Sequence, residues 1–458
     1  MAERFEIVTK ALVKMLEEKK YAALRDILLV MNPSDIAALF DDLQESHIPL
    51  LFRLLPKELA AETFVEMETE AQELLIRGFS DNELKEIVDE LYVDDAAALV
   101  EEMPANVVKR ILQQADPEMR SSINQILRYP ENSAGSIMTT EYVSLRPEMT
   151  VEEAILRIRR QGVDKETIYT CYVTQDRTLI GLVTVKDLLL APSDDLPISE
   201  IMLTNLISVT THTDQEEVGK MFGKYDFLAL PVVDGENRMV GIVTFDDAMD
   251  VMEEEFTEDM EIMGGMTPSE KTYLRSSAFD LFKHRIPWLM LLMMSATFTG
   301  LIITAFEGAL AAQVALTAFI PMLMGTGGNS GSQSSVTVIR ALSLDELALS
   351  DIWRVIWKEL RTSVLCAVVL AVVCFVKIWL VDRMLLGNED ITLMVNAVVC
   401  LALAVTVVLA KLVGGILPIA AKALKLDPAV MASPFITTIV DALSLLVYFL
   451  FAQALLGL

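Results

Sequence analysis

The pattern of apolar and polar positions divides this chain of 458 residues into two parts. Up to about residue 275, apolar and charged residues alternate at short intervals, whereas the remainder consists mostly of long apolar runs. A helix needs about 20 predominantly apolar residues to cross a bilayer. Five runs are long enough: residues 286–305, 309–339 (with a polar interruption), 363–380, 393–417 and 429–451. We therefore expect a five-span α-helical membrane domain over residues 276–458.

Residues 1–130 carry a helical pattern throughout. Short amphipathic segments such as NPSDIAALFDDL and FSDNELKEIVDEL recur, often opened by Pro or Asp. Their spacing of roughly 20–25 residues is close to the period of small helical-repeat arrays. Since each segment is too short to bury its apolar face alone, it has to pack against its neighbours. The sequence predicts an all-α, acidic helical-repeat domain.

A different repeat follows. The motif SIMTTEYVS, which begins at Ser136, returns 64 residues later as EIMLTNLIS from Glu200. The motif IGLVTVKD, which ends at Asp187, returns 60 residues later as VGIVTFDD, which ends at Asp247. Short polar segments separate pairs of apolar runs, as is typical of two strands joined by a turn. We expect two α/β units, 131–196 and 197–250, with helices over residues 151–160 and 215–222.

This doubled pattern resembles a tandem pair of CBS domains. The resemblance implies an intramolecular regulatory module, which is often dimeric and often senses a ligand. Lys186 and Asp187, at the end of the first motif, resemble the nucleotide-contacting end of a CBS cleft. ATP is therefore a candidate ligand of this part of the chain.

An acidic segment joins the two parts of the chain. Residues 248–275 read as one long helix with a break at Gly264 and Gly265, and we assign 251–275 as an acidic connecting helix. Charge runs of this kind are often solvated linkers. Methionine and phenylalanine residues at helical spacing favour instead a helix with one packed face.

The net charge of −28 lies entirely on the first part. Residues 1–275 contain 54 acidic and 26 basic residues, whereas 276–458 contain 11 of each. A field of that sign disfavours nucleic acid and anionic membrane surfaces, and it attracts cations. The alternative is that the acidic residues serve solubility alone.

The distribution of basic residues predicts the orientation in the membrane. The N-terminal segment lacks the apolar core of a signal peptide, and four scattered cysteines suggest no disulfide framework. With the acidic part in the cytoplasm, the predicted inward loops carry most of the basic residues, as the positive-inside rule requires. These are Lys283, Arg285, Arg340, Arg354, Lys358, Arg361, Lys422 and Lys425. We expect a multi-pass protein of the cell membrane with its N-terminal half in the cytoplasm.

Two features break the apolar pattern where polar groups are costly. The first is PMLMGTGGNSGSQSS, from Pro321 to Ser335. Its small residues permit close helix packing, which is one interpretation. Asn329 and Gln333, however, need polar partners at membrane depth, and backbone loosened by glycines is tolerated there only beside protein or a wet cavity. We favour a pore-lining segment.

The second feature is Asp441. It lies 12 residues after Ala429, or ~18 Å along a helix, which places it near the middle of the bilayer. A lone carboxylate at that depth predicts an ion or proton pathway; the alternative is a protonated, hydrogen-bonded packing residue. Lys377 and Lys411 lie nearer the ends of their segments, where we expect their side chains to snorkel.

The order of these parts resembles the MgtE family of magnesium channels over essentially the whole chain. The motifs that carry the resemblance are Gly-Thr-Gly-Gly-Asn-x-Gly-x-Gln, Asp427-Pro-Ala and Thr-x-x-Asp441. It implies a homodimer with a central pore, in which Asp441 faces the permeating ion and Asp427 at the cytoplasmic mouth helps to hold a regulatory ion. The pore-lining positions would be Gly325, Gly328, Asn329, Gln333, Thr437 and Thr438.

The same resemblance implies regulatory Mg²⁺ ligands in the soluble part. They are Glu62, Asp94, Asp214, Glu216, Asp226, Asp247, Asp250, Glu255, Glu258 and Asp259. One position departs from the family pattern, because Ala98 stands four residues after Asp94, where relatives often have an acid. We expect one helical-domain site to be weaker as a result.

The predicted function is Mg²⁺ uptake through a channel that cytosolic Mg²⁺ closes. Mg²⁺ sheds water reluctantly, so a carboxylate-lined pore can hold it hydrated. A secondary divalent-cation exchanger and a membrane-anchored nucleotide sensor are the alternatives. A chloride channel also combines CBS pairs with spans, but its CBS units usually follow the membrane part. We expect no enzyme activity, since the chain has neither a Gly-x-x-x-x-Gly-Lys-[Ser/Thr] phosphate loop nor an aspartyl-phosphate signature.

Overall fold

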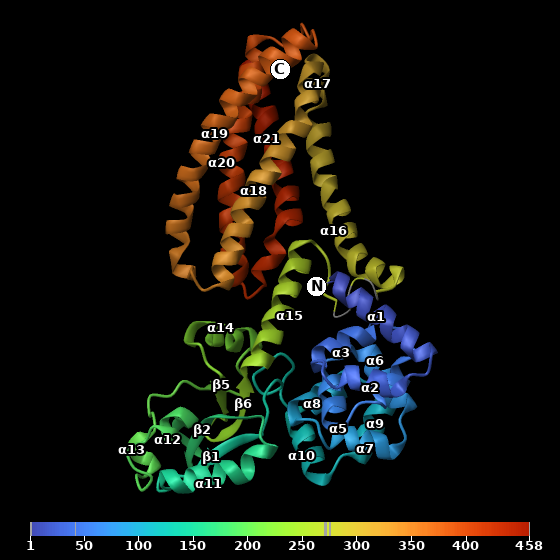
Figure 1. Ribbon diagram of the computed structural model, residues 1–458. Coiled ribbons are helices and arrows are strands. Elements are labelled where there is room, and N and C mark those ends of the chain that lie inside the picture. The colour runs from blue at the N-terminus through green and yellow to red at the C-terminus, as the bar shows by residue number, and fades with distance from the viewer. Residues whose placement is uncertain (1, 42, 270–272, 274–275, 458) are drawn as a thin grey trace. The chain divides into compact units, whose positions relative to one another are not determined.

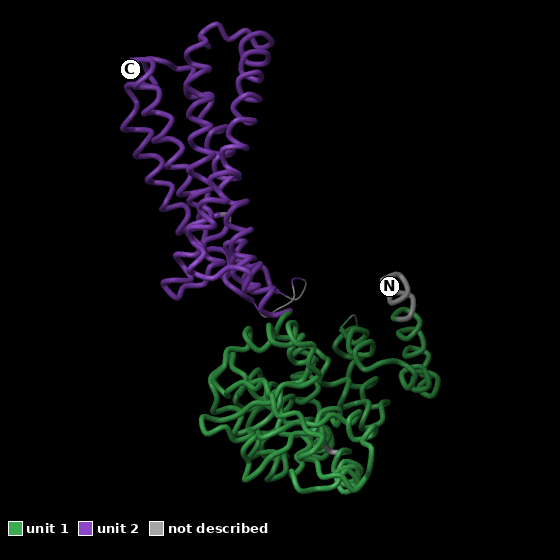
Figure 2. The backbone as a smooth tube through the Cα atoms, turned by 90° about the vertical axis from the view of Figure 1, so that its left-hand side faces the viewer, with its two compact units in different colours: residues 1–252 green, residues 253–458 purple. Residues whose placement is uncertain are grey.

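The computed structural model describes residues 2–41, 43–269, 273 and 276–457. The chain divides into two compact units, Met1–Met252 and Glu253–Leu458 (Figure 2). We refer to them as the soluble unit and the membrane unit. Each is described on its own.

The first part of the soluble unit is entirely helical, as predicted. Its helices are α1 (Ala2–Glu17), α2 (Tyr21–Leu28), α3 (Pro33–Asp41), α4 (Ile48–Phe52), α5 (Lys57–Val65), α6 (Thr69–Gly78), α7 (Asp81–Val88), α8 (Val93–Glu102), α9 (Ala105–Gln114) and α10 (Pro117–Ile126), the blue part of Figure 1. They are short because caps interrupt them. At α7, for example, Ser80 and Glu83 form a reciprocal capping box. Leucine, isoleucine and phenylalanine side chains form one continuous core between the helices.

The second part of the soluble unit holds two three-stranded sheets among its described residues. The strands are β1 (Tyr142–Leu145), β2 (Thr167–Gln175) and β3 (Thr178–Thr184), then β4 (Val209–Thr210), β5 (Ala229–Val233) and β6 (Met239–Thr244). In each sheet the first strand is parallel to the second and the second antiparallel to the third. The two sheets therefore share one topology, which confirms the CBS pair.

Helices follow the strands at equivalent places in both repeats. They are α11 (Val151–Gln161), the 3₁₀ turn η1 (Gly162–Asp164) and α12 (Val185–Leu189) in the first, and α13 (Ile198–Ile201), α14 (Gln215–Tyr225) and α15 (Phe245–Met263) in the second. The repeats also exchange backbone hydrogen bonds. Thr139 pairs with Ile242 and Thr178 with Arg238, so each repeat completes part of the other.

Helix α15 is acidic and begins at Phe245, before the predicted connecting segment. It ends at Met263, just before the predicted break, and Gly265 has a φ of 71°, a conformation that favours glycine. Residues 270–272 and 274–275 of the predicted connecting helix lie outside the described residues.

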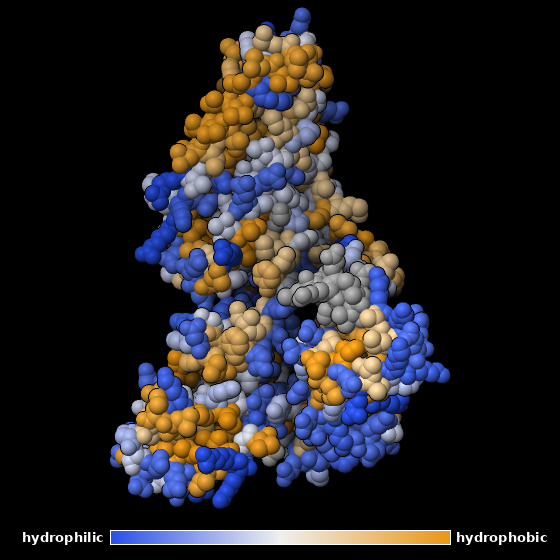
Figure 3. Space-filling view, viewed as in Figure 1, coloured by the Kyte–Doolittle hydropathy of each residue, from blue (hydrophilic) through white to orange (hydrophobic). Residues whose placement is uncertain are grey.

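The membrane unit is helical. Its elements are α16 (Ala278–Ala305), α17 (Glu307–Ala312), η2 (Val314–Phe319), α18 (Ile320–Ser343), η3 (Leu349–Asp351), α19 (Ile352–Lys377), η4 (Ile378–Leu385), α20 (Leu393–Ala423), η5 (Pro428–Met431) and α21 (Ser433–Leu456). Helices α18, α20 and α21 pack on one another, and α19 packs on α20. Much of the outer surface of this unit is apolar (Figure 3).

Among the described residues, four helical segments are long and apolar enough to cross a membrane. They are Ala278–Ala305, Leu349–Leu385, Leu393–Ala423 and Pro428–Leu456. Helix α18 has 24 residues, enough to span, but its Gly, Ser, Asn and Gln side chains make it much less apolar. The fifth span therefore stays a prediction.

Candidate functional site

Asp441 lies on α21, a helix of otherwise apolar and small polar residues. It is partly exposed, and its carboxylate has no hydrogen-bond or ion-pair partner among the residues that the structure describes. Thr437 and Thr438, earlier on the same helix, donate their hydroxyls to the Pro434 carbonyl at 2.9 and 3.0 Å. Their hydrogen bonds are thus satisfied within the helix, whereas Asp441 is left for another partner.

The glycines of α18 bring that helix against the Asp441 face of α21. A Cβ at Gly328 would lie 3.0 Å from the Thr437 side chain, and one at Gly327 would lie 3.0 Å from Val440. Both contacts are tighter than an ordinary side chain accepts, so glycine is required for this approach. Thr437 and Asp441 are four residues apart and share a face of α21. The glycine-rich segment therefore lies close to Asp441.

A polar stripe runs along the exposed side of α18. Gly325, Asn329 and Gln333 are spaced by four residues, so they share one helix face, and all three are exposed. The intervening positions Gly327, Gly328 and Gly331 are buried. Exposed amide side chains on a membrane helix need water or polar partners. This stripe and Asp441 form the candidate site of the membrane unit.

Asp427 lies at the start of η5, in the segment that leads into α21. Its carboxylate is exposed and accepts a hydrogen bond from the Ala429 backbone N–H at 2.7 Å. In the described structure it therefore serves as a helix cap. Because only one lone pair is used, its remaining oxygen valences are available to a cation.

The soluble unit contains a second concentration of carboxylates, where α8 meets the CBS pair. We call it the acidic cluster; it consists of Asp94, Asp95, Glu141, Glu166, Asp246 and Asp247. Glu141 accepts a hydrogen bond from the Val93 N–H at 3.2 Å, which joins the loop before β1 to the first turn of α8. The Glu166 N–H donates to the Glu141 carbonyl at 3.0 Å. The cluster therefore joins residues from α8, the first CBS repeat and α15.

Burial and mutual repulsion perturb these carboxyl groups. Asp94 is only 9% exposed, and burial followed by the charge of Asp95 raises its pKa to about 7. Burial and the nearby Asp94 likewise raise the pKa of Asp247 to about 7, and burial raises that of Glu166 to about 9. One Glu166 oxygen is buried with no partner among the described residues. The charged forms are destabilised, and a cation would relieve that.

Of the predicted regulatory ligands, the structure brings Asp94 and Asp247 together in the acidic cluster. Asp214 caps α14 and accepts from the Glu216 N–H at 2.9 Å. The Glu216 carboxylate pairs with Lys220 at 2.7 Å. Asp226, with a φ of 54°, ends the same helix and is exposed. Glu62 is exposed on α5 and lies outside the cluster.

The remaining predicted ligands lie along α15. Asp250 and Glu258 are exposed on that helix, whereas Glu255 and Asp259 are partly buried. Across the described parts of the chain, no three His, Cys, Asp or Glu side chains stand close enough together to chelate a bare ion. The arrangement suits a hydrated cation, which needs only outer contacts with carboxylates.

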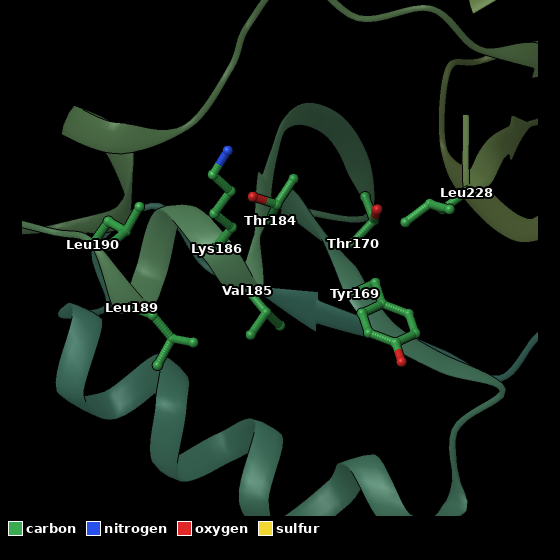
Figure 4. A pocket seen from close by; sticks show the side chains of 8 residues that line it. All are labelled: Tyr169, Thr170, Thr184, Val185, Lys186, Leu189, Leu190 and Leu228. Atoms are coloured by element: carbon green, nitrogen blue, oxygen red, sulfur yellow. The ribbon is translucent and has the colours of Figure 1, made fainter. Parts of the chain in front are cut away.

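A cavity of about 480 Å³ lies mainly in the first CBS repeat, and Leu228 of the second repeat completes its lining (Figure 4). It is lined by Tyr169, Thr170, Thr184, Val185, Lys186, Leu189, Leu190 and Leu228. Of the two predicted nucleotide contacts, Lys186 lines this cavity. Asp187 does not; its carboxylate accepts from the Thr184 N–H and hydroxyl at 3.1 and 2.5 Å, so it caps α12. An apolar wall with one aromatic ring and one ammonium suits a base and a phosphate.

Sequence reasoning missed four members of the acidic cluster: Asp95, Glu141, Glu166 and Asp246. Two of them had a local signal, since Asp95 and Asp246 directly adjoin the predicted Asp94 and Asp247. Glu141 and Glu166 had none, because they enter the cluster through contacts between distant segments. The corresponding residue to Glu141 in the second repeat is Asn205, so the repeat pattern gives no hint of a carboxylate there.

The fold and the two acidic regions define a class: membrane-embedded cation transporters that carry a CBS-containing soluble part. Residues 320–451 match the family model MgtE, described as a divalent cation transporter. Residues 31–132 match the MgtE intracellular N domain, and residues 134–194 and 198–254 match the CBS domain.

Individual relatives extend the match over the full chain. The magnesium transporter MgtE of Thermus thermophilus is 37% identical over 98% of this chain and 99% of its own length. The magnesium transporter MgtE of Bacillus subtilis is 32% identical, covering 98% and 97%. This chain belongs to the MgtE family.

A solved structure is similar to the soluble part. It is the cytosolic domain of the Mg²⁺ channel MgtE in complex with ATP, which is 39% identical with a TM-score of 0.51. The match covers 53% of this chain and 99% of that one.

Proposed function

We propose that this protein takes up Mg²⁺ through a channel whose permeation path passes Asp441 and the polar stripe of α18. The observation that carries the proposal is the Asp441 carboxylate, which has no described protein partner in a membrane helix. An ionisable group at membrane depth is costly unless an ion, water or a counter-charge accompanies it. A passing divalent cation supplies that charge.

The chemistry of the site favours hydrated Mg²⁺. The nearby groups are oxygen and amide ligands, without the thiolate or imidazole clusters that select softer metals. Among the described residues no charged side chain acts on the Asp441 carboxylate, so no second acid is beside it to strip the hydration shell. A hydrated ion needs only outer-shell contacts, which Asp441 and the Asn329 amide can provide.

We propose that the channel is a homodimer of five-span subunits. In one chain, the stripe of Gly325, Asn329 and Gln333 is exposed. Facing lipid, those amides would be unsatisfied. A second copy would enclose the stripe and place two Asp441 carboxylates around one path. In this proposed dimer, α18 is the fifth membrane span of each subunit, and the acidic soluble unit lies in the cytoplasm.

We further propose that cytosolic Mg²⁺ closes the channel by binding to the acidic part. The raised pKa values of Asp94, Asp247 and Glu166 reflect burial and repulsion between neighbouring carboxylates. Divalent cations between these groups would offset the repulsion and favour the compact arrangement. Asp214, Glu216 and Asp226 around α14, and Asp427 with the acids of α15, are the other proposed contacts. Uptake is thereby reduced when cytosolic Mg²⁺ is sufficient.

ATP is the proposed ligand of the CBS cavity. The support is the lining by Tyr169 and Lys186, together with the ATP in the similar cytosolic domain. Binding of ATP to the purified protein should weaken in Lys186→Gln, measured by calorimetry. Unchanged affinity of Lys186→Gln for ATP would contradict ATP binding in this cavity.

The decisive assay for the transport proposal is ²⁸Mg²⁺ uptake into proteoliposomes. Asp441→Asn keeps the size of the side chain and removes its charge, and we expect a loss of about 100-fold or more. The matched control is Asp345→Asn, because Asp345 is an exposed carboxylate of the same unit with a φ of 52°, which Asn tolerates. Wild-type uptake by a correctly folded Asp441→Asn protein would refute the permeation path.

A further inference from the structure

Glu359 links three helices of the membrane unit. It is the eighth residue of α19, and its Oε2 accepts a hydrogen bond from the Ser334 hydroxyl of α18 at 2.6 Å. Ser334 is only 3% exposed. On the way, the Glu359 side chain crosses α20 at Gly415, where a Cβ would stand 3.1 Å from the Glu359 Cγ. Glycine at that position leaves room for the carboxylate to reach α18.

A buried lysine lies one helical turn away. Lys411 precedes Gly415 by four residues on α20, about 6 Å along the axis. Its side chain was expected to snorkel, but the residue is only 6% exposed, so that expectation is wrong. The helix continues for 12 residues beyond it, to Ala423, so Lys411 lies within the helix and not at its end.

Glu359 is the counter-charge that the geometry offers to Lys411. No carboxylate oxygen lies within 4 Å of the Lys411 ammonium among the described residues. Glu359 packs on the same helix, one turn along, through Gly415. Lys411 is buried and Glu359 is partly buried, and a buried ammonium is disfavoured unless an opposite charge accompanies it.

The contact between Glu359 and Ser334 is connected to the candidate permeation site. Ser335, next to Ser334, donates its hydroxyl to the Met431 carbonyl at 2.5 Å, directly before α21. One turn back along α18, Gly331 packs against Ile436 of α21 and the Ala410 carbonyl of α20. The two adjacent serines therefore hold α18 to two different neighbours, one through Glu359 and one through the segment that leads to Asp441.

We propose that Glu359, with Lys411 as its counter-charge, is a positioning residue for ion permeation. It holds α18 in register against α20 and α21 and so fixes the polar stripe beside Asp441. Glu359 itself does not touch the ion. The inference rests on the proposed permeation path.

The test measures the geometry of the path with cobalt hexammine, a mimic of a hydrated cation, as an inhibitor of Mg²⁺ uptake in proteoliposomes. Glu359→Ala should raise the inhibition constant about tenfold, because a displaced site loses much of its binding even when the ligand itself is retained. Ser334→Ala removes a single hydroxyl, should fold even where Glu359→Ala does not, and should raise the constant about threefold. Lys358→Gln, the exposed neighbour on α19, should leave it unchanged.

The charge swap separates positioning from simple packing. The single substitutions Glu359→Lys and Lys411→Glu each place like charges together, whereas the double variant Glu359→Lys/Lys411→Glu restores opposite charges. The double variant should recover at least about half of the loss of inhibitor binding seen in the two single variants. If Glu359 and Lys411 only fill space, the losses of the two single substitutions should add in the double variant, with no recovery. An inhibition constant unchanged within about twofold in folded Glu359→Ala and Ser334→Ala would overturn the proposal.

Asp441→Asn distinguishes a failure of this inference from a failure of the proposed function. If Asp441→Asn abolishes uptake while the Glu359 and Ser334 variants behave as wild type, only the positioning role is wrong. If Asp441→Asn transports Mg²⁺ normally, the permeation path itself is wrong.

Discussion

The two units of this protein use carboxylates in opposite ways. In the membrane unit, Asp441 stands without a described partner. In the soluble unit, Asp94, Asp247 and Glu166 crowd together, and burial with mutual repulsion raises their pKa values. A solitary carboxylate can bind and release a passing ion without rearrangement of its neighbours. A crowded group stores repulsion that a divalent cation relieves, so its geometry responds to ion concentration.

The largest expected effect concerns the solitary carboxylate, Asp441, and tests whether the ion passes it in hydrated form. Cobalt hexammine cannot shed its ammonia ligands, so it tests whether the path accepts a hydrated ion. We expect it to block Mg²⁺ uptake completely at saturation and to lose its effect on the residual uptake of Asp441→Asn. Competition only by ions that lose their water would contradict outer-shell binding.

Neutralising several of the proposed regulatory carboxylates, two from the acidic cluster and two outside it, should abolish closure. The combined variant Asp94→Asn, Asp226→Asn, Asp247→Asn and Glu258→Gln removes four negative charges. We expect uptake to persist at about 1–10 mM Mg²⁺, an order of magnitude that suits weak oxygen-ligand sites. The control removes four exposed charges elsewhere: Glu118→Gln, Glu152→Gln, Glu200→Gln and Glu236→Gln. Closure that survives in the first variant, or is lost in the control, would count against regulation by the proposed carboxylates.

The acidic cluster should also make stability depend on pH. The pKa values of Asp94 and Asp247 are about 7 in the folded protein, above their values of about 4 in an unfolded chain. The folded state therefore binds more protons, so stability is greatest below about pH 4 and is lost as pH rises towards about 7. Glu166 extends the loss to about pH 9.

Thermal unfolding of the full chain in detergent measures this effect. Without Mg²⁺, the midpoint for the soluble unit should fall between pH 6 and pH 8, by about 2–4 °C for each kcal/mol lost. Added Mg²⁺ should raise it more at pH 8 than at pH 6, since the carboxylates are then charged. An equal Mg²⁺ effect at both pH values would contradict binding at these groups.

The smallest effect is expected for a single substitution in the cluster. Because many weak sites act together, Asp247→Ala should shift the Mg²⁺ concentration for half-closure by only about two- to fivefold, under ~1 kcal/mol. Limited proteolysis across a Mg²⁺ titration, in parallel with transport, should show protection of the soluble unit that follows closure. If Mg²⁺ protects the soluble unit from proteolysis at concentrations that leave transport unchanged, Mg²⁺ binding to that unit does not close the channel.

Much of the fold was predictable because its signals are local. Amphipathic segments, the doubled CBS motif and the apolar runs each specify elements over fewer than about 30 residues. The helical domain and the CBS pair are confirmed. The acidic connecting helix and the fifth span stay predictions, and in α18 the amides that suggest a pore are the residues that weaken the apolar signal of a span.

The candidate sites were less predictable, since they depend on contacts between distant segments. Glu141 and Glu166 belong to no motif and join the acidic cluster only through the CBS fold. The burial of Lys411 is not predictable from its position along the helix, because that position does not reveal which side chains cover it. Gly415, one turn later, is a signal in the sequence that a side chain from another helix could cross α20 there, as that of Glu359 does.

The most direct test of the account is a current recording in planar bilayers. The purified protein is held at fixed voltage with Mg²⁺ as the permeant cation and no counter-ion to exchange, with Asp441→Asn as the comparison. The account predicts a steady Mg²⁺ current with unitary steps, lost in Asp441→Asn and reduced by millimolar Mg²⁺ on the side of the soluble unit. Absence of a steady current while Mg²⁺ uptake proceeds against a counter-ion gradient would identify an exchanger and contradict the channel.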